Sequence, residues 1–219
     1  VVISENNIAS SDYLINVNLH DENIDKQSFY NMDILINASS ICCYYSTSGT
    51  VGDPQIVQIA HSSVINQIIW MIDEMDYSSN DKVLLCVNQK FSAARHQIFS
   101  SLCSGSQLII SSTHSAEIFV QDLLIHHVTK LYITPSQMNL LLDHLENNVK
   151  FYYLCLTLKT VTLGSEIVNS KIIHKTFNQF PALDYIQTLY GQTECSGCVY
   201  RNIYYQDEKL LDNHNNLGT

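Results

Sequence analysis

The sequence is short of basic residues: 11 Lys and Arg stand against 21 Asp and Glu, a formal net charge of -10 over 219 residues. A broad nucleic-acid or anionic-membrane surface is therefore disfavoured, because such surfaces need clustered cations. Small anions can still bind through backbone N–H groups. No apolar run approaches the ~20 residues of a membrane span, and no basic segment followed by an apolar one opens the chain. We therefore expect a cytoplasmic protein without a membrane span.

A regular cysteine framework is also missing. The seven cysteines are odd in number and irregularly placed, which is typical of reduced structural thiols. Cys195 and Cys198 have C-x-x-C spacing without a second pair, and adjacent Cys42 and Cys43 make a poor chelator. The histidines form no H-E-x-x-H pattern, so a hydrolytic metal site is disfavoured. Since the chain begins with Val and stops at "NNLGT", we expect a piece of a longer protein.

The fold class follows from the hydrophobic pattern. Residues 1–40 are polar and predict an irregular lead-in. From Ile41 onward, short β-branched runs alternate with segments of helical period, which predicts an α/β fold of stacked βα units on a largely parallel sheet. The predicted strands are 41–45, Lys82–Val87, Gln107–Ser111, Lys130–Thr134, Thr160–Gly164 and Leu183–Tyr190. The predicted helices are one that begins near His61 and has Asp73 and Glu74 near its end, Ala93–Cys103, Ala116–His127, Pro135–Leu145 and Asn169–Phe180.

The first of these helices should bury one apolar face. Val64, Ile65, Ile68, Ile69 and Ile72 recur at helical spacing, which predicts that all five face the core.

A loop rich in Ser, Thr and Gly, "STSGTVGDP" at 46–54, lies between the first strand and the first helix. Such a loop can cradle phosphate oxygens through hydroxyl and backbone N–H groups. It matches neither the Walker pattern, because the lysine is missing, nor the dinucleotide G-x-G-x-x-G spacing. Composition alone leaves two readings open, a phosphate cradle and a flexible polar connection.

A second motif, "TLYGQTECSG" at 188–197, follows a predicted strand. An aromatic ring can stack on a base, a Thr hydroxyl can bond a phosphate, and a Glu can hold Mg²⁺. The ordered set "YSTSGTVGDPQIV", "FSAARHQIF", "LGSE" and "LYGQTE" resembles the adenylate-forming, AMP-binding superfamily. That superfamily includes acyl-CoA synthetases, luciferases and nonribosomal peptide synthetase adenylation domains, and within it the chain most resembles the beta-alanine-activating branch.

The resemblance implies that residues 41–219 are a partial AMP-binding domain, part of the large N-terminal domain, without the C-terminal lid. It implies ATP-dependent activation of a carboxylic acid, an amino acid such as beta-alanine or a fatty acid, as an acyl-adenylate. Mg²⁺ would assist, and the acceptor would be the thiol of phosphopantetheine or CoA, the former on a carrier domain downstream in the parent chain. The family's ribose-binding Asp and lid Lys have no counterpart here, so the chain alone should turn over slowly.

The resemblance also assigns the phosphate loop. The residues matching the family's loop around the ATP phosphates are Thr47, Ser48, Gly49, Thr50, Gly52 and Gln55. The chain departs from "TSGTTGxPKG" by Val51 for Thr, Gln55 for Lys and Ile56 for Gly. Loss of one charge-assisted phosphate contact costs on the order of 1.5–3 kcal/mol, which weakens the loop without abolishing it.

The second motif resembles the family's "YGPTE". Tyr190 would stack on adenine beside Gly191, Thr193 would contact the α-phosphate, and Glu194 would bind Mg²⁺, so Thr193 and Glu194 carry the catalytic assignment. The residues assigned to the adenine pocket are Gly164, Ser165, Glu166, Thr188, Tyr190 and Gly191.

The acid pocket is assigned to Phe91, Ser92 and His96 by the same resemblance. Amino-acid-activating members carry Asp where Ser92 stands, so a substrate ammonium would lose its buried counter-charge here. Arg95 could meet a carboxylate or could simply be solvated. A non-catalytic remnant that binds a nucleotide or a partner is the alternative, motivated by Val51, Gln55 and Ser92.

Overall fold

The structure, a computed structural model, describes residues 2–4, 16–18, 26–28, 30, 34–46, 55–89, 91–111, 115–147, 157–195 and 198–205. The chain divides into two compact units, Val1–Ile36 and Asn37–Thr219. In the first unit, β1 (Val2–Ser4) pairs in parallel with β2 (Asn16–Asn18). Two short strands therefore lie in the stretch expected to be an irregular lead-in.

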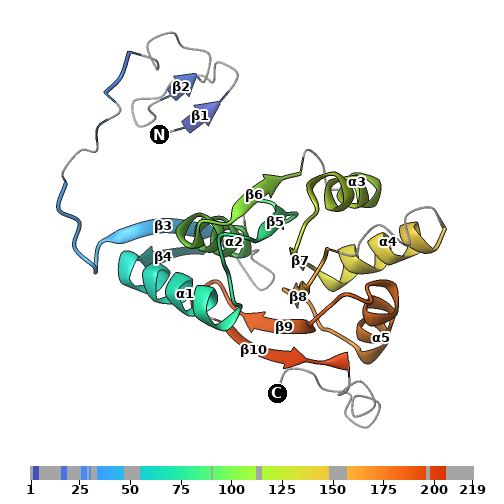
Figure 1. The fold of residues 1–219 in the computed structure, drawn as a ribbon. Coiled ribbons are helices and arrows are strands. Elements are labelled where there is room, and N and C mark those ends of the chain that lie inside the picture. The colour runs from blue at the N-terminus through green and yellow to red at the C-terminus, as the bar shows by residue number, and fades with distance from the viewer. Residues whose placement is uncertain are drawn as a thin grey trace. The chain divides into compact units, whose positions relative to one another are not determined.

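A six-stranded sheet forms the centre of the second unit (Figure 1). Its strands are β5 (Lys82–Leu85), β6 (Gln107–Ile110), β7 (Lys130–Ile133), β8 (Thr160–Gly164), β9 (Tyr185–Gly191) and β10 (Cys198–Ile203). They lie in the order β10-β9-β8-β7-β5-β6. Only β10, which pairs with β9, is antiparallel to its neighbour. The predicted α/β fold with a largely parallel sheet is confirmed.

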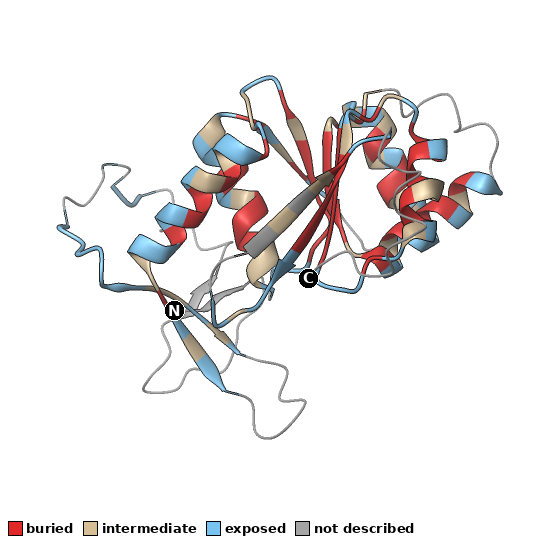
Figure 2. Ribbon diagram, turned by 90° about the horizontal axis from the view of Figure 1, so that it is seen from below, coloured by how far each residue is buried: buried red, intermediate tan, exposed pale blue. Residues whose placement is uncertain are grey.

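Helices cover both faces of this sheet. They are α1 (His61–Glu74), α2 (Ser92–Ser104), α3 (Ala116–His126), α4 (Pro135–Glu146) and α5 (Ser170–Gln179). Figure 2 shows the buried strands between the two helical layers. Among the described residues, no helix has the length and apolar character that a membrane crossing requires.

The two layers bury different residues of the same strands. Leu84 and Leu131 belong to the core under α3, α4 and α5, whereas Leu85 and Tyr132 belong to the core under α1 and α2. Successive strand side chains point to opposite faces, so a strand covered on both sides must be apolar throughout. This explains why Val83, Leu84 and Leu85 of β5 are all apolar.

A separate two-stranded sheet lies beside α1. Here β3 (Ile41–Ser46) pairs antiparallel with β4 (Ile56–Ala60), and Ile59 packs with Val64 and Ile68 of α1. The expectation that the 41–45 strand belongs to the stacked βα sheet is therefore wrong. β4 was not predicted, because it runs into α1 without a turn residue between them.

The apolar face of α1 is narrower than its pattern predicts. Val64 and Ile68 are buried, but Ile65 and Ile69 are 51% and 63% exposed. Met71 at 1% exposure extends the buried stripe instead. The prediction that Ile65 and Ile69 face the core is wrong. The elements β3, β4 and α2 pack against one side of α1, and Ile65 and Ile69 lie on its exposed side.

Candidate active site at the carboxyl edge of the sheet

The sheet has a topological switch point between β5 and β7. After β5 the chain passes through α2 to β6 on one side, and it then returns through α3 to β7 on the other side of β5. Ligands of open parallel sheets bind outside the carboxyl ends of the strands at such a point. The segments that follow β5, β7, β8 and β9 all leave the sheet at this edge, and they include three of the predicted site segments.

The turn after β8 is closely packed. A Cβ added at Gly164 would lie 2.6 Å from Tyr132 Oη and 3.3 Å from Leu189 O, so only glycine fits without a shift. Ser165 has a φ of 69°, a left-handed conformation that costs a non-glycine residue about 1 kcal/mol. Its Oγ lies 3.4 Å from Tyr132 Oη. Gly164 and Ser165 thus hold the backbone against the ring of Tyr132 from β7.

Glu166 binds the start of α4. Its Oε2 accepts hydrogen bonds from Ser136 N at 2.9 Å and from Ser136 Oγ at 2.6 Å. A carboxylate is favoured there because the first N–H groups of a helix lack partners within it. Glu166 therefore joins the β8 turn to α4. Sequence reasoning missed Ser136, although "TPSQ" at 134–137 has the T-x-x-Q spacing of a capping box.

The "YGQTE" segment begins at the end of β9 and continues past the strand. Tyr190 is 57% exposed, and its Oη accepts a hydrogen bond from Gln192 Nε2 at 3.1 Å. Glu194 is exposed beyond the strand end. Thr188, two residues before Tyr190, is 6% exposed inside the strand. The ring of Tyr190 and the carboxylate of Glu194 are thus accessible at the carboxyl edge, whereas Thr188 is buried.

The segment after β5 leads into α2. Phe91 is the N-cap residue of α2 and is 63% exposed, and Ser92 opens the helix. His96 lies one turn further along and is 8% exposed. Burial, with the nearby charge of Arg95, lowers the pKa of His96 to about 4. The predicted acid-pocket residues thus differ in solvent exposure, since Phe91 is accessible whereas His96 is in the interior.

Arg95 fixes the tautomer of His96. Arg95 Nη2 lies 2.8 Å from His96 Nε2. A guanidinium has donors only, so Nε2 accepts and the ring proton is on Nδ1. Arg95 is 5% exposed, so the expectation of a solvated helix position is wrong.

The predicted phosphate loop connects β3 to β4. Ser46 of β3 pairs with Ile56 of β4, so the predicted loop lies in sequence between two paired strands instead of between a strand and a helix as the sequence suggested. Thr47, Ser48, Gly49, Thr50 and Gly52 lie outside the described residues, as do Val51 and the rest of 47–54. Gln55 is exposed directly before β4.

The residues at this edge fit a magnesium ion held together with substrate phosphates. The described residues contain no cluster of three or more His, Cys, Asp or Glu side chains suited to a metal. Glu194 offers one exposed carboxylate. Mg²⁺ is commonly held by one or two carboxylates plus substrate phosphates, so a single carboxylate suffices where phosphates supply the other ligands.

Comparison with known proteins identifies the family. Residues 5–218 match the AMP-binding enzyme family. The chain belongs to the AMP-binding enzymes. It is 30% identical over 203 residues to bacitracin synthase 3 of Bacillus licheniformis, covering 90% of this chain and 3% of that protein.

Two further proteins are similar to this chain. The L-proline–[L-prolyl-carrier protein] ligase of Streptomyces coelicolor is 24% identical, with 74% of this chain and 30% of the ligase covered. The crystal structure of the Vibrio cholerae adenylation domain AlmE in complex with glycyl-adenosine-5'-phosphate shares the fold, with a TM-score of 0.69 and 20% identity. It matches 77% of this chain and 31% of the AlmE chain. This AMP-binding chain therefore spans only a small part of its relatives' lengths.

Proposed function

We propose that this chain is part of an adenylation domain that activates a carboxylic acid with ATP. The observation that carries the proposal is the position of "YGQTE" at the end of β9, on the edge where the β8 turn and the start of α2 also lie. Tyr190 presents an accessible ring for adenine, and Glu194 presents an accessible carboxylate beyond it.

In the proposed reaction, a carboxylate oxygen of the acid attacks the α-phosphorus of ATP. The bond to the bridging oxygen breaks, and pyrophosphate leaves with the electron pair. Thr193 hydrogen-bonds the α-phosphate, while Thr47, Ser48, Gly49, Thr50 and Gly52 surround the outer phosphates with help from Gln55. Bound Mg²⁺ supplies charge neutralisation on the phosphates, and Glu194 would hold it. Positioning and charge neutralisation supply most of the rate in reactions of this kind.

The proposed acid is an amino acid or another carboxylic acid. AlmE was crystallised with a glycyl adenylate, and the Streptomyces relative is named for proline and a carrier protein. Beta-alanine and fatty acids stay in the candidate set because Ser92 carries no charge to pair with an α-ammonium. The acceptor thiol would be phosphopantetheine on a carrier domain, or CoA.

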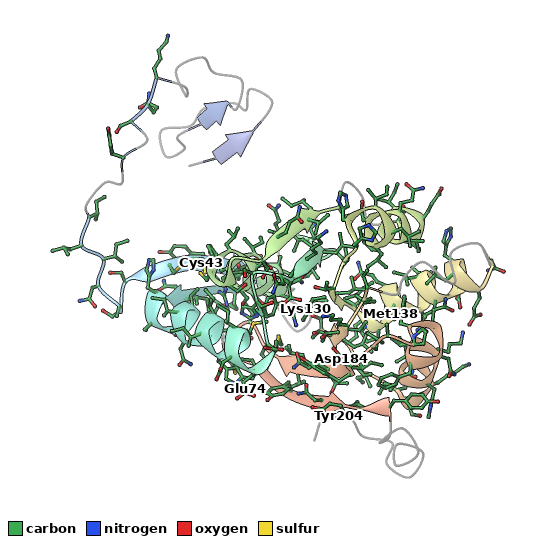
Figure 3. All side chains as sticks on the ribbon, in the orientation of Figure 1. Cys43, Glu74, Lys130, Met138, Asp184 and Tyr204 are labelled. Atoms are coloured by element: carbon green, nitrogen blue, oxygen red, sulfur yellow. The ribbon has the colours of Figure 1, made fainter. Side chains whose placement is uncertain are left out.

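The experiment is ATP–pyrophosphate exchange by the full-length protein over a panel of amino acids, beta-alanine and fatty acids. We expect exchange with at least one acid, and a drop of about tenfold or more in the Glu194→Gln variant, since a metal ligand would be lost. Asp184→Asn is the matched control, because Asp184 is also exposed but precedes β9 at the opposite end of the strand (Figure 3). No exchange with any acid would overturn the proposal.

The second candidate is a non-catalytic remnant that binds nucleotide without activating an acid. Val51 and Gln55 in the loop, together with Ser92, favour it, since each departs from a chemically demanding residue type. Calorimetry with ATP and Mg²⁺ separates the two: nucleotide binding unchanged by Glu194→Gln, without exchange, would favour the remnant.

A further inference from the structure

Two adjacent cysteines lie at an irregularity in β3. Ile41 pairs with Ala60 and Cys43 with Ile59, so Cys42 is an extra residue without a partner across the ladder. An extra residue of this kind forms a β-bulge, which bends the strand and breaks the regular alternation of side chains. The bulge therefore allows the two thiols to lie near one another.

Both cysteines lie on the same apolar cluster. Burial raises the pKa of Cys42, and the neighbouring Cys43 raises it further. Both side chains are half-buried and pack against the apolar cluster of Ile59, Val64 and Ile68. The two side chains are thus held at one site and are still reachable by a small molecule.

A cation is fixed against one of them. Arg95 Nη1 of α2 donates a hydrogen bond to Cys43 Sγ at 3.3 Å, and the guanidinium lies 5.3 Å from the centroid of the Tyr45 ring. Figure 3 labels Cys43 where β3 passes α2. A buried guanidinium on a sulfur stabilises negative charge on that atom, and the thiolate is the form that reacts with oxidants. The contact with Arg95 therefore distinguishes Cys43 from Cys42.

We propose that Cys42 and Cys43 are a peroxide-sensitive thiol pair that closes to a disulfide between adjacent residues. The Cys43 thiolate attacks one oxygen of hydrogen peroxide, the O–O bond breaks, and the sulfur becomes a sulfenic acid as hydroxide leaves. Cys42 sulfur then attacks that sulfur, the S–O bond breaks, and a second hydroxide leaves. With the two thiol protons, these form two molecules of water. Two thiols lose two electrons in total, and one peroxide gains them.

The disulfide would be easy to reduce. Adjacent Cα atoms lie about 3.8 Å apart, below the usual disulfide range of about 4.4–6.8 Å, and strained disulfides have more oxidising potentials. The pair would therefore act reversibly.

The test treats the full-length protein with hydrogen peroxide and follows the peptide containing both cysteines by mass spectrometry under non-reducing conditions. We expect that peptide to lose the mass of two hydrogen atoms and to regain it with dithiothreitol. In Cys42→Ser the loss should disappear and dimedone should trap the Cys43 sulfenic acid. Cys103→Ser is the control, because Cys103 is exposed on α2 and should not affect the pair.

Arg95 provides a second readout. Arg95→Gln should slow the oxidation by about tenfold through loss of a charge-assisted hydrogen bond, whereas Arg95→Lys should keep most of the rate. A peptide that keeps its hydrogens, or a Cys42→Ser variant in which dimedone traps nothing at Cys43, would overturn the proposal. The mass change is measured without nucleotide, so its outcome is independent of whether an acid is activated.

Discussion

Glu166 joins the turn after β8 to the first turn of α4. Its carboxylate accepts both the backbone and the hydroxyl hydrogen bond of Ser136. The resemblance places this residue beside adenine. The hydrogen bonds show that it also connects the β8 turn to α4, which the motif alone does not reveal. Both roles are compatible, because the helix start fixes where the turn lies.

We expect Glu166→Ala to lower the free energy of unfolding by about 1 kcal/mol, a modest value because the side chain is exposed. Glu117→Ala is the control, since Glu117 lies in the first turn of α3 and shares the favourable helix dipole. Urea unfolding curves measure both. Equal losses of unfolding free energy in the two variants would contradict this, because the hydrogen bonds to Ser136 would then contribute no stability beyond the interaction with the helix dipole.

His96 gives the structure a pH dependence. Its pKa is lowered from 6.5 to about 4 by burial and by Arg95, so the folded state disfavours the protonated ring. The unfolded chain takes up the proton first as the pH falls. The contribution of the neutral His96 ring to the free energy of unfolding is therefore fully present above pH 6.5. It is lost as the pH falls toward about 4.

Between these pH values the free energy of unfolding should fall by on the order of 3 kcal/mol from this group. His96→Gln, which keeps an acceptor for Arg95, should remove that part of the slope. Urea unfolding at a series of pH values measures it, with His126→Gln as control, because His126 lies at the end of α3 away from Arg95. An unchanged slope in His96→Gln would refute the assignment.

At the scale of elements, helix boundaries were the most predictable feature. Each of the five helices lies within one or two residues of its predicted range, because the end signals are local. Asn169 caps α5 through Ile172 N at 3.0 Å, and Gly105 ends α2 with a φ of 76°. The strands of the parallel core were predictable for a similar reason, since each is a short apolar run between helices.

Pairing between strands was less predictable. β4 and β10 were missed, because their residues give no local signal of an antiparallel partner. β4 is positioned by its pairing with β3, and β10 by its pairing with β9. The apolar face of α1 was overestimated at Ile65 and Ile69, since which side of a wide apolar stripe is covered depends on the tertiary neighbours.

The candidate site was predictable in its motifs and not in its contacts. Residues of "LYGQTE" and "LGSE" do lie at the ends of neighbouring parallel strands. The contacts of Glu166 with Ser136 and of Arg95 with Cys43 join residues 30 and 52 positions apart, so no local pattern contains them.

The start of α4 offers a test at this scale. Thr134 Oγ1 accepts a hydrogen bond from Gln137 N at 3.2 Å, and Gln137 Oε1 accepts one from Thr134 N at 3.2 Å. Thr134→Ala should cost about 1 kcal/mol of stability, and Thr134→Ser should cost little. Urea midpoints of both variants check this; an equal loss in Thr134→Ser would point to the methyl group instead of the cap.

For the whole molecule, the net charge of -10 accords with the proposed binding of phosphates through a local loop and a metal instead of a basic surface. The AMP-binding relatives are much longer than this chain, which covers 3% of bacitracin synthase 3 and 30% of the Streptomyces ligase. The proposed reaction therefore belongs to the full-length protein.

The most direct test of the central claim is the identity of the nucleotide product formed by the full-length protein with MgATP and the acid that supports exchange. Mass spectrometry after rapid quenching should find a species with the mass of the acid plus AMP less one water, together with pyrophosphate. ADP and phosphate in place of these would contradict the account, because they would show attack at the γ-phosphorus instead of the α-phosphorus.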